Sequence, residues 1–265
     1  MKNLKLIVVS ITQSITLAIF FIASVSASDL QREKRMAEEL VGVIFDGEAV
    51  FMKVDSHEFL SIYTQAEEAK GAAVILHGRG FHPDWQDAIN PLRVGLAESG
   101  WNTLSVQMPV LEKQAKYYDY VPLFSEALPR IDAAIKYVRS QGADKVVLIA
   151  HSCGVHMAMA WAEAQYKGKQ SQKIDAFVGI GMGATDYQQP MAHPFPLDKL
   201  AVPVLDVYAD GDYPAVIKNA AQRFAMIQQA GNKLSRQIKI TGANHYYEDK
   251  GEALTQAISQ WLETL

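Results

Sequence analysis

Short apolar runs alternate with longer amphipathic segments along most of this chain. From residue 72 onward the runs have the length of a strand and contain mainly Val, Ile, Leu and Ala, at Ala73–Leu76, Asn102–Val106, Lys145–Ile149, Ala176–Ile180, Val204–Tyr208 and Gln237–Ile240. Continuous apolar runs of this length are typical of strands that are buried on both faces of a sheet. We therefore predict six buried strands.

Segments of helix length lie between these runs, several of them followed by glycine, at Asn90–Ser99, Leu123–Ser140, Gly154–Tyr166, Ala215–Ala230 and Gly251–Leu262. A glycine just past the last periodic residue is a common helix end. Regular alternation of strand and helix predicts the α/β class, a mostly parallel sheet with helices on both faces. No internal repeat or low-complexity linker divides the chain, so we expect one domain.

The residues before this pattern are of a different kind. Residues 29–40 are charged and favour a helix, whereas residues 41–64 alternate apolar and polar side chains around an Asp46–Gly47 pair. Such alternation around Asp-Gly predicts a β-hairpin that turns at this pair. We assign residues 28–71 to a helix and hairpin of the same domain, with its core in residues 72–265.

The first 27 residues have the pattern of a signal peptide. Two lysines precede an apolar stretch that ends near Ala23, and small residues follow it up to Ala27. This predicts cleavage after Ala27, export to the periplasm and no membrane span afterwards. An uncleaved anchor is the alternative, because residues 6–23 approach the ~20 apolar residues of a spanning helix, although residues 12–14 are polar.

The charge and cysteine content narrow the possible functions. The net charge is −4, and removal of a leader with two lysines and no acidic residue would make it −6. Without a cluster of basic residues, nucleic acid is a poor candidate partner. Cys153 is the only cysteine, so no internal disulfide can form.

Ser152 lies where a predicted strand turns directly into a predicted helix. Ala150 and Gly154, two residues to either side, are small, although the pattern is A-x-S-x-G rather than G-x-S-x-G. A strand-turn-helix elbow exposes a serine nucleophile, and small neighbours let helix and strand approach closely. The alternative is that Ser152 only caps the helix.

A serine nucleophile needs a base, and the base needs a group that orients it. His245 follows the last predicted strand, so it can fold over the elbow and is our predicted base. We expect His151 and His156, beside the serine in sequence, to be packing or rim residues. His57 and His193 have surface or loop positions.

Three aspartates near the end of the strand at residues 204–208 could orient this base. Asp206 lies within the strand, and Asp210 precedes Gly211 and could simply form a turn. We predict Asp212 as the orienting acid, with Asp210 as the alternative.

The loop after the first parallel strand completes the candidate site. An oxyanion needs preorganised N–H donors, for which we predict the backbone amides of Cys153 and Arg79. His77, Gly78 and Gly80 surround Arg79 and are possible substrate contacts, although two glycines can also mark a tight turn alone.

In this order the motifs resemble the α/β-hydrolase superfamily, over residues 72–265. Residues 81–85 and 100–109 are similar to an exported bacterial family known only as a domain of unknown function. The resemblance implies an eight-stranded sheet, a site at the carboxyl ends of its strands, and no metal or organic cofactor. Only residues 182–200 separate the fourth and fifth predicted parallel strands, which leaves no room for a large cap domain.

Two segments are candidates for the pocket border, although both could equally be surface loops. One is the loop at residues 182–200, with Pro190, Pro194 and Pro196, and the other contains Tyr117, Tyr118 and Tyr120.

The function that these residues favour is a serine hydrolase that cleaves a small ester-like acyl substrate through an acyl-enzyme. Arg79 could also hold an anionic group of the substrate. Cys153 as nucleophile is a weaker alternative, since His151 and Val155 would occupy the positions that need small residues. A non-catalytic envelope binding or assembly module is the alternative from a different class. The sequence indicates neither the acyl length nor the oligomeric state.

Overall fold

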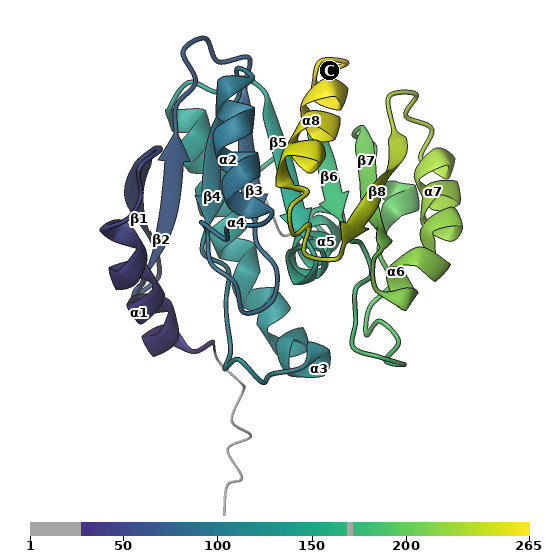
Figure 1. Cartoon of the computed structure of the whole chain (residues 1–265), viewed down its shortest axis with the longest axis horizontal. Helices are drawn as coiled ribbons and strands as arrows, with labels where there is room; N and C mark the ends of the chain where they lie inside the picture. Colours follow the sequence, from purple (N-terminus) through teal and green to yellow (C-terminus); the bar gives the residue numbers. More distant parts are fainter. Residues whose placement is uncertain (1–27, 169–171) are drawn as a thin grey trace, which may run out of the picture.

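A single eight-stranded sheet forms the centre of the molecule (Figure 1). The computed structural model describes residues 28–168 and 172–265, so the predicted signal peptide lies outside the described residues. The strand order is β1-β2-β4-β3-β5-β6-β7-β8, and β3 to β8 run parallel while β2 is antiparallel to both of its neighbours. This confirms the predicted fold class.

The strands match the predicted runs closely. Their bounds are β1 (Glu48–Val54), β2 (His57–Thr64), β3 (Ala72–Leu76), β4 (Asn102–Val106), β5 (Val146–His151), β6 (Ala176–Ile180), β7 (Val204–Gly211) and β8 (Arg236–Asn244). Only β7 and β8 are clearly longer than predicted, and they pair with each other as far as Gly211 and Asn244. The extension of β8 contains exposed polar residues, so apolar patterning did not indicate it.

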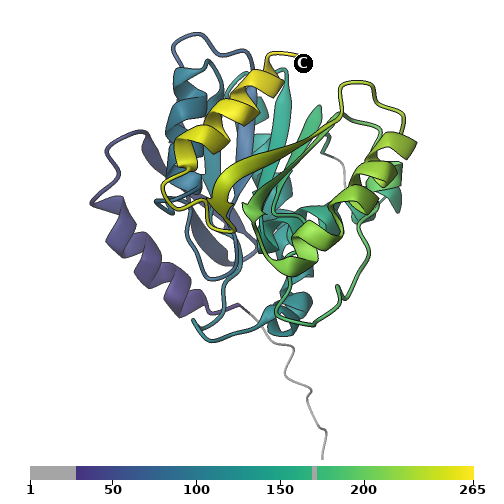
Figure 2. The same cartoon turned by 45° about the vertical axis from the view of Figure 1, so that its right-hand side comes forward.

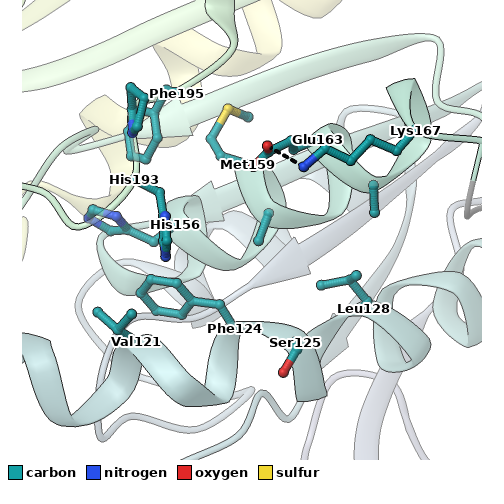
Figure 3. A pocket seen from close by; sticks show the side chains of 13 residues that line it. Val121, Phe124, Ser125, Leu128, His156, Met159, Glu163, Lys167, His193 and Phe195 are labelled. Carbon is teal, nitrogen blue, oxygen red and sulfur yellow. Dashed lines mark hydrogen bonds and ion pairs between the residues drawn. The ribbon is translucent and has the colours of Figure 1, made fainter.

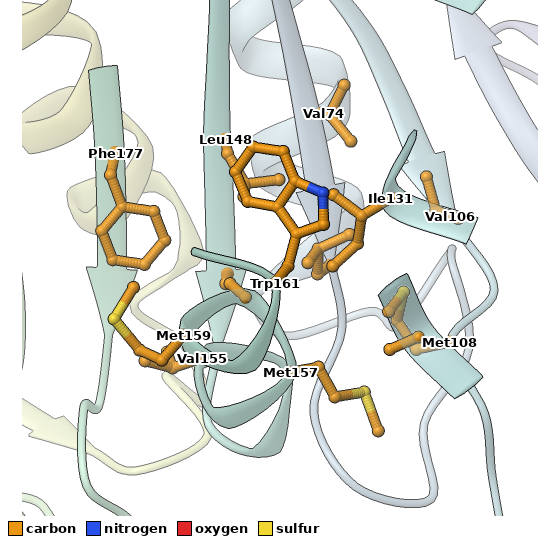
Figure 4. Packing of buried hydrophobic residues seen from close by; sticks show 14 of the residues in the cluster. Val74, Val106, Met108, Ile131, Leu148, Val155, Met157, Met159, Trp161 and Phe177 are labelled. Atoms are coloured by element: carbon orange, nitrogen blue, oxygen red, sulfur yellow. The ribbon is translucent and has the colours of Figure 1, made fainter. Parts of the chain in front are cut away.

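Helices cover both faces of the sheet (Figures 1 and 2). Helices α2 (Ile89–Glu98) and α8 (Gly251–Leu262) pack on one face, and α4 (Phe124–Ser140) and α5 (Cys153–Tyr166) pack on the other. Figure 4 shows side chains of α5, among them Trp161 and Val155, packed against strand residues such as Leu148 and Phe177. The turn at Ser152 thus leads directly into α5, most of whose residues are buried.

The predicted helix at residues 215–230 is two helices, α6 (Pro214–Lys218) and α7 (Ala220–Gln229). At the break, side chains donate hydrogen bonds to backbone carbonyls of α6. The Asn219 side-chain amide donates to the Ala215 oxygen at 2.9 Å, and the Arg223 guanidinium donates to the Val216 oxygen at 2.7 Å. Side chains that bond backbone carbonyls compete with a continuous helix. Short helical turns not predicted from the sequence are α3 (Tyr117–Tyr120), Val121–Leu123 and Leu197–Lys199.

The predicted hairpin exists, but its turn was misplaced. β1 and β2 are joined at residues 55–56, where Asp55 has a φ of 52°. Asp46–Gly47 instead precedes β1, and a Cβ on Gly47 would lie 2.5 Å from the Tyr63 carbonyl oxygen. Glycine is needed there because two backbones approach closely, and the Asp-Gly pair is therefore not a hairpin turn.

Helix α1 (Leu30–Val41) is fixed to the sheet domain by a buried ion pair. Glu33 is 3% exposed and accepts from Arg130 at 2.9 Å, and it also contacts His57 Nε2 at 3.0 Å. Removal of one partner of a buried ion pair leaves an uncompensated charge and typically costs about 3–5 kcal/mol. Within residues 28–168 and 172–265, no helix combines the length and the apolar character that crossing a membrane requires.

Candidate active site

Ser152 lies on a strained turn between β5 and α5. Its φ of 55° and ψ of −118° are rare for a residue with a side chain. Hydrogen bonds hold the turn, since the Ser152 N–H donates to the Ile180 oxygen at 2.9 Å. Gly154 lets α5 approach β3, because a Cβ there would lie 2.6 Å from the His77 carbonyl oxygen. The predicted elbow geometry is therefore confirmed.

The structure brings Ser152, His245 and Asp212 together. His245 Nε2 lies 2.8 Å from Ser152 Oγ, and His245 Nδ1 lies 2.6 Å from Asp212 Oδ1. Asp212 follows β7 directly and His245 follows β8 directly, so the long pairing of these two strands sets their separation. The Ser152 side chain makes no cap hydrogen bond to α5, which argues against a role as a simple helix cap.

The environment of Asp212 favours its ionised form. Burial alone would raise its pKa, but the hydrogen bond and charge of His245, with the amides of Tyr213 and Ala209, hold the pKa below its ordinary value. An ionised carboxylate accepts a hydrogen bond from Nδ1–H and so holds the proton on that nitrogen, which leaves the Nε2 lone pair free to accept a hydrogen bond from the Ser152 hydroxyl. The Tyr213 ring stacks on the imidazole at 4.0 Å between centroids and limits its rotation.

The other two candidate aspartates have different partners. Asp210 is exposed near the end of β7, and it accepts from the amide of Gly242 on the neighbouring strand β8 at 2.9 Å. Asp206 is fully buried and pairs with Arg223 at 3.0 Å. Only Asp212 of the three contacts His245 in the described part of the chain, in agreement with the preferred prediction.

His77 is a positioning residue for the loop after β3. Its Nδ1 lies 2.8 Å from the Gly78 oxygen, and its Nε2 accepts from the Met108 amide at 2.9 Å. Burial lowers the pKa of His77 to about 3, so the imidazole is neutral. Both ring nitrogens are engaged inside the protein, and neither His77 nor Gly78 lines the cavity described below, so the structure gives no support to a substrate contact by these two residues.

His151 and His156 are packing residues, as predicted. His151 Nε2 lies 2.9 Å from the His245 carbonyl oxygen, and His156 Nε2 lies 2.9 Å from the Ala184 oxygen. Burial lowers the pKa of each to about 4. His151 therefore supports the backbone that carries the candidate base, a role that its sequence position did not suggest.

The loop at residues 77–80 lies directly against the elbow. A Cβ on Gly78 would lie 3.2 Å from the Ser152 Cβ. Cys153 is the first residue of α5, and the backbone N–H groups at the start of a helix have no carbonyl acceptor within the helix. Its amide and that of Arg79 thus belong to backbone on two sides of Ser152. Burial raises the pKa of the Cys153 thiol to about 12, which argues against the cysteine alternative.

A cavity of about 480 Å³ opens over Ser152 and His245. Aromatic side chains make up much of its wall, and they are Phe81, Trp85, Tyr117, Tyr120, Tyr213 and Tyr246. The Phe81 and Trp85 rings stack at 3.9 Å. Asp84 between them binds the buried Arg93 guanidinium at 2.8 Å, which fixes this segment.

The predicted pocket borders are confirmed in part. Tyr117 and Tyr120 line the cavity over Ser152, whereas Tyr118 is exposed. From the loop at residues 182–200, Ala184 and Thr185 line it and the three prolines do not.

A second cavity of about 290 Å³ lies between α4, α5 and residues 193–195 (Figure 3). Phe124, His156 and Phe195 line it, as does Pro194. Its only ion pair, between Glu163 and Lys167, lies at 2.7 Å between exposed side chains. Ser152 and His245 line the first cavity and not this one.

Sequence analysis missed several residues of the first cavity. Tyr213 and Tyr246 directly follow Asp212 and His245, so their proximity to the site was available from the sequence. Arg32, which also lines the cavity, comes from a distant segment without such a signal, as does Asp186, which binds Arg79. Among residues 28–168 and 172–265, no group of three His, Cys, Asp or Glu side chains is arranged to hold a metal ion.

Comparisons with known proteins agree with this fold. A family described as "Protein of unknown function (DUF3530)" matches residues 22–122 and 123–264. No curated protein sequence matches the chain significantly.

Many solved structures are similar to the chain in fold. Est1E from Butyrivibrio proteoclasticus is 18% identical, with a TM-score of 0.60 over 83% of this chain and 98% of that one. A dienelactone hydrolase from Anabaena variabilis is 19% identical, with a TM-score of 0.60 over 83% and 97%. A lidless α/β serine hydrolase from Xanthomonas campestris is 13% identical, with a TM-score of 0.58 over 83% and 95%. At such identities the likeness establishes the α/β-hydrolase fold.

Proposed function

We propose that this chain, which belongs to the DUF3530 family, is a serine hydrolase that cleaves a small ester-like acyl substrate. The observation that carries the proposal is the 2.8 Å contact between Ser152 Oγ and His245 Nε2, on an imidazole that is oriented by Asp212 at 2.6 Å. The strained elbow and the cavity above it supply the remaining requirements of this chemistry. The serine hydrolase and the dienelactone hydrolase among the structures of similar fold support the same reaction class.

In the first half of the reaction, Ser152 Oγ forms a bond to the substrate carbonyl carbon as its proton passes to His245 Nε2. The oxyanion accepts hydrogen bonds from the amides of Arg79 and Cys153. The carbonyl then re-forms, the bond to the alcohol oxygen breaks, and His245 returns the proton to the leaving alcohol. Asp212 stabilises the imidazolium without taking its proton.

In the second half, water attacks the acyl-serine carbonyl and gives its proton to His245. Collapse of the second tetrahedral intermediate releases the carboxylic acid, and His245 returns the proton to Ser152 Oγ. The protein ends in its starting state. The pattern of the first 27 residues supports a further part of the proposal, that this reaction takes place in the periplasm of a Gram-negative cell.

A fluorophosphonate probe tests the proposal directly. The purified protein without its leader should become covalently labelled, because an activated serine attacks the phosphorus, and labelling should be absent in Ser152→Ala. Gel fluorescence and peptide mass spectrometry report the extent and the site.

Two outcomes would contradict the assignment. A wild-type protein that stays unlabelled would favour the non-catalytic envelope module. Loss of labelling in Cys153→Ala but not in Ser152→Ala would favour the cysteine nucleophile.

A matched pair of aspartate variants tests the orienting acid. Asp212→Asn should lower kcat by about 10⁴-fold, because an amide donates to the imidazole and stabilises the wrong tautomer. Asp210→Asn removes an equivalent carboxylate two residues away, at an exposed position near the end of β7, and should change kcat less than twofold. Steady-state hydrolysis of a 4-nitrophenyl ester measures both, and equal losses in the two variants would exclude the assignment.

A further inference from the structure

The wall of the first cavity is cationic although the chain as a whole is acidic. Besides the aromatic residues, four basic side chains and one carboxylate line it: Arg32, Arg79, Lys113, Lys116 and Glu112. The net charge of the chain is −4. A concave site whose charge opposes that of the whole protein concentrates ligands of the opposite sign.

The most central of these cations is already paired. Arg79 donates from both terminal nitrogens to the Asp186 carboxylate, at 2.8 and 3.0 Å. Asp186 also accepts from the Tyr117 amide at 2.6 Å. This bidentate pair neutralises the guanidinium, so the anionic substrate contact that the sequence suggested for Arg79 does not fit its surroundings.

Arg32 has no such neutralising partner. Its guanidinium donates to two backbone carbonyls, those of Gly80 at 3.2 Å and of Leu111. Within the described residues no carboxylate lies within ion-pair distance of its side chain. A guanidinium has five N–H donors, so donors remain for a ligand after these two contacts.

The position of Arg32 over the cavity is fixed. It belongs to α1, whose neighbouring Glu33 forms the buried pair with Arg130. The Asp29 amide also donates to the Val110 oxygen at 2.7 Å, just before this helix begins. Figures 1 and 2 both show α1 at the same end of the sheet as α3. An arginine on a fixed helix loses little freedom when it binds a ligand.

Two lysines extend the same cationic wall. Lys113 and Lys116 are exposed and lie in the segment between β4 and α3. Neither forms an ion pair in the part of the chain that the structure describes. With Glu112 as the single opposing charge, the wall formed by Arg32, Lys113 and Lys116 keeps an excess of positive charge.

We infer that the substrate is an acyl ester that carries a carboxylate, which Arg32 binds with help from Lys113 and Lys116 while the ester carbonyl lies at Ser152. This inference rests on the proposed serine hydrolase function and narrows its substrate class. Arg32 is then a specificity-determining residue, since it contacts a part of the substrate that does not react.

Paired esters test the inference. We expect the wild type to hydrolyse mono-4-nitrophenyl glutarate or 4-acetoxybenzoate, which carry a carboxylate on the acyl and the alcohol side, with kcat/KM at least tenfold above the neutral methyl ester of the same compound. In Arg32→Gln the ratio for the preferred pair should fall about tenfold, the effect of one lost charge-assisted hydrogen bond. Arg35→Gln, an exposed position of the same helix outside the cavity wall, should keep the wild-type ratio.

The outcomes separate this inference from the proposed function. If the protein reacts with fluorophosphonate but hydrolyses each neutral ester with the same kcat/KM as its anionic partner, only the carboxylate site is refuted. If it neither reacts nor hydrolyses, the proposed function itself fails. If the protein is labelled but hydrolyses none of the esters, competition provides the test. Millimolar glutarate should slow fluorophosphonate labelling of Arg35→Gln but not of Arg32→Gln. Equal labelling rates of the two variants in the presence of glutarate would refute the carboxylate site.

Discussion

Replacement of Ser152 by alanine should lower kcat for a short acyl ester by about 10⁶-fold, the size of loss that follows removal of the nucleophile from a serine hydrolase triad. In the proposed mechanism the hydroxyl oxygen is the only atom of this side chain that bonds to the substrate, and without it His245 has no nucleophile to activate. Residual hydrolysis should come from the amides of Arg79 and Cys153 alone. Initial rates with 4-nitrophenyl acetate, at high protein concentration, measure the difference.

A matched control separates this loss from unfolding. Ser125→Ala removes a hydroxyl from an exposed position in α4, which lines the second cavity, and should keep full activity. Both variants should show the far-UV circular dichroism of the wild type. A Ser152→Ala protein that is folded and retains a tenth of the wild-type rate would contradict the mechanism, and a large loss in Ser125→Ala would direct attention to the second cavity.

Acid should destabilise the folded protein as the pH falls from about 6.5 toward 4. Burial lowers the pKa of His77 to about 3 and the pKa of His151 and His156 to about 4. Below the ordinary histidine pKa of about 6.5, these three histidines are protonated in the unfolded chain but stay neutral in the folded chain. These groups therefore do not reduce the free energy of unfolding above this pH, and they lower it progressively as the pH falls toward 4.

The expected size of the effect is large. Each of these histidines should lower the free energy of unfolding by about 2 kcal/mol between pH 6.5 and pH 5, because one pH unit of differential protonation corresponds to about 1.4 kcal/mol. Burial raises the pKa of Asp206, Asp132 and Asp87, which acts in the opposite direction and reduces this loss of stability. Total stability of a domain is only about 5–15 kcal/mol, so urea unfolding followed by fluorescence should show a steep loss of unfolding free energy over this range.

The slope of stability against pH identifies the groups responsible. His156→Gln keeps a donor for the Ala184 oxygen and cannot be protonated, so its unfolding free energy should fall less steeply by about 1.4 kcal/mol per pH unit. Lost ring packing would shift the whole curve without a change in its slope. Identical slopes in wild type and His156→Gln would contradict the explanation.

The buried parts of the fold were predictable because burial produces a pattern. Strands such as β3 and β5 are apolar on both faces, and α5 follows its strand without a gap, so the elbow at Ser152 was visible in the sequence. The exposed parts gave weaker signals. Apolar patterning missed the last four residues of β8, and the Asp46–Gly47 pair was taken for a turn although it marks a close approach of two backbones.

The candidate site divides along the same line. Ser152, Asp212 and His245 each follow a strand, and parallel strands end at one edge of a sheet, so their meeting could be inferred from topology. Partners that come from elsewhere could not. Nothing in the sequence pairs Arg79 with Asp186, and nothing brings Arg32 of α1 to the Gly80 carbonyl, because these contacts depend on how loops and α1 pack.

The contact at Gly154 has a mechanical consequence. A Cβ there would lie 2.6 Å from the His77 oxygen and 2.9 Å from the Leu76 oxygen, so the first turn of α5 rests on the peptide groups where the loop at residues 77–80 begins. The Ser152 oxygen and the amides proposed to donate hydrogen bonds to the oxyanion therefore cannot shift independently. The packing of α5 on the end of β3 therefore fixes their alignment before a ligand binds.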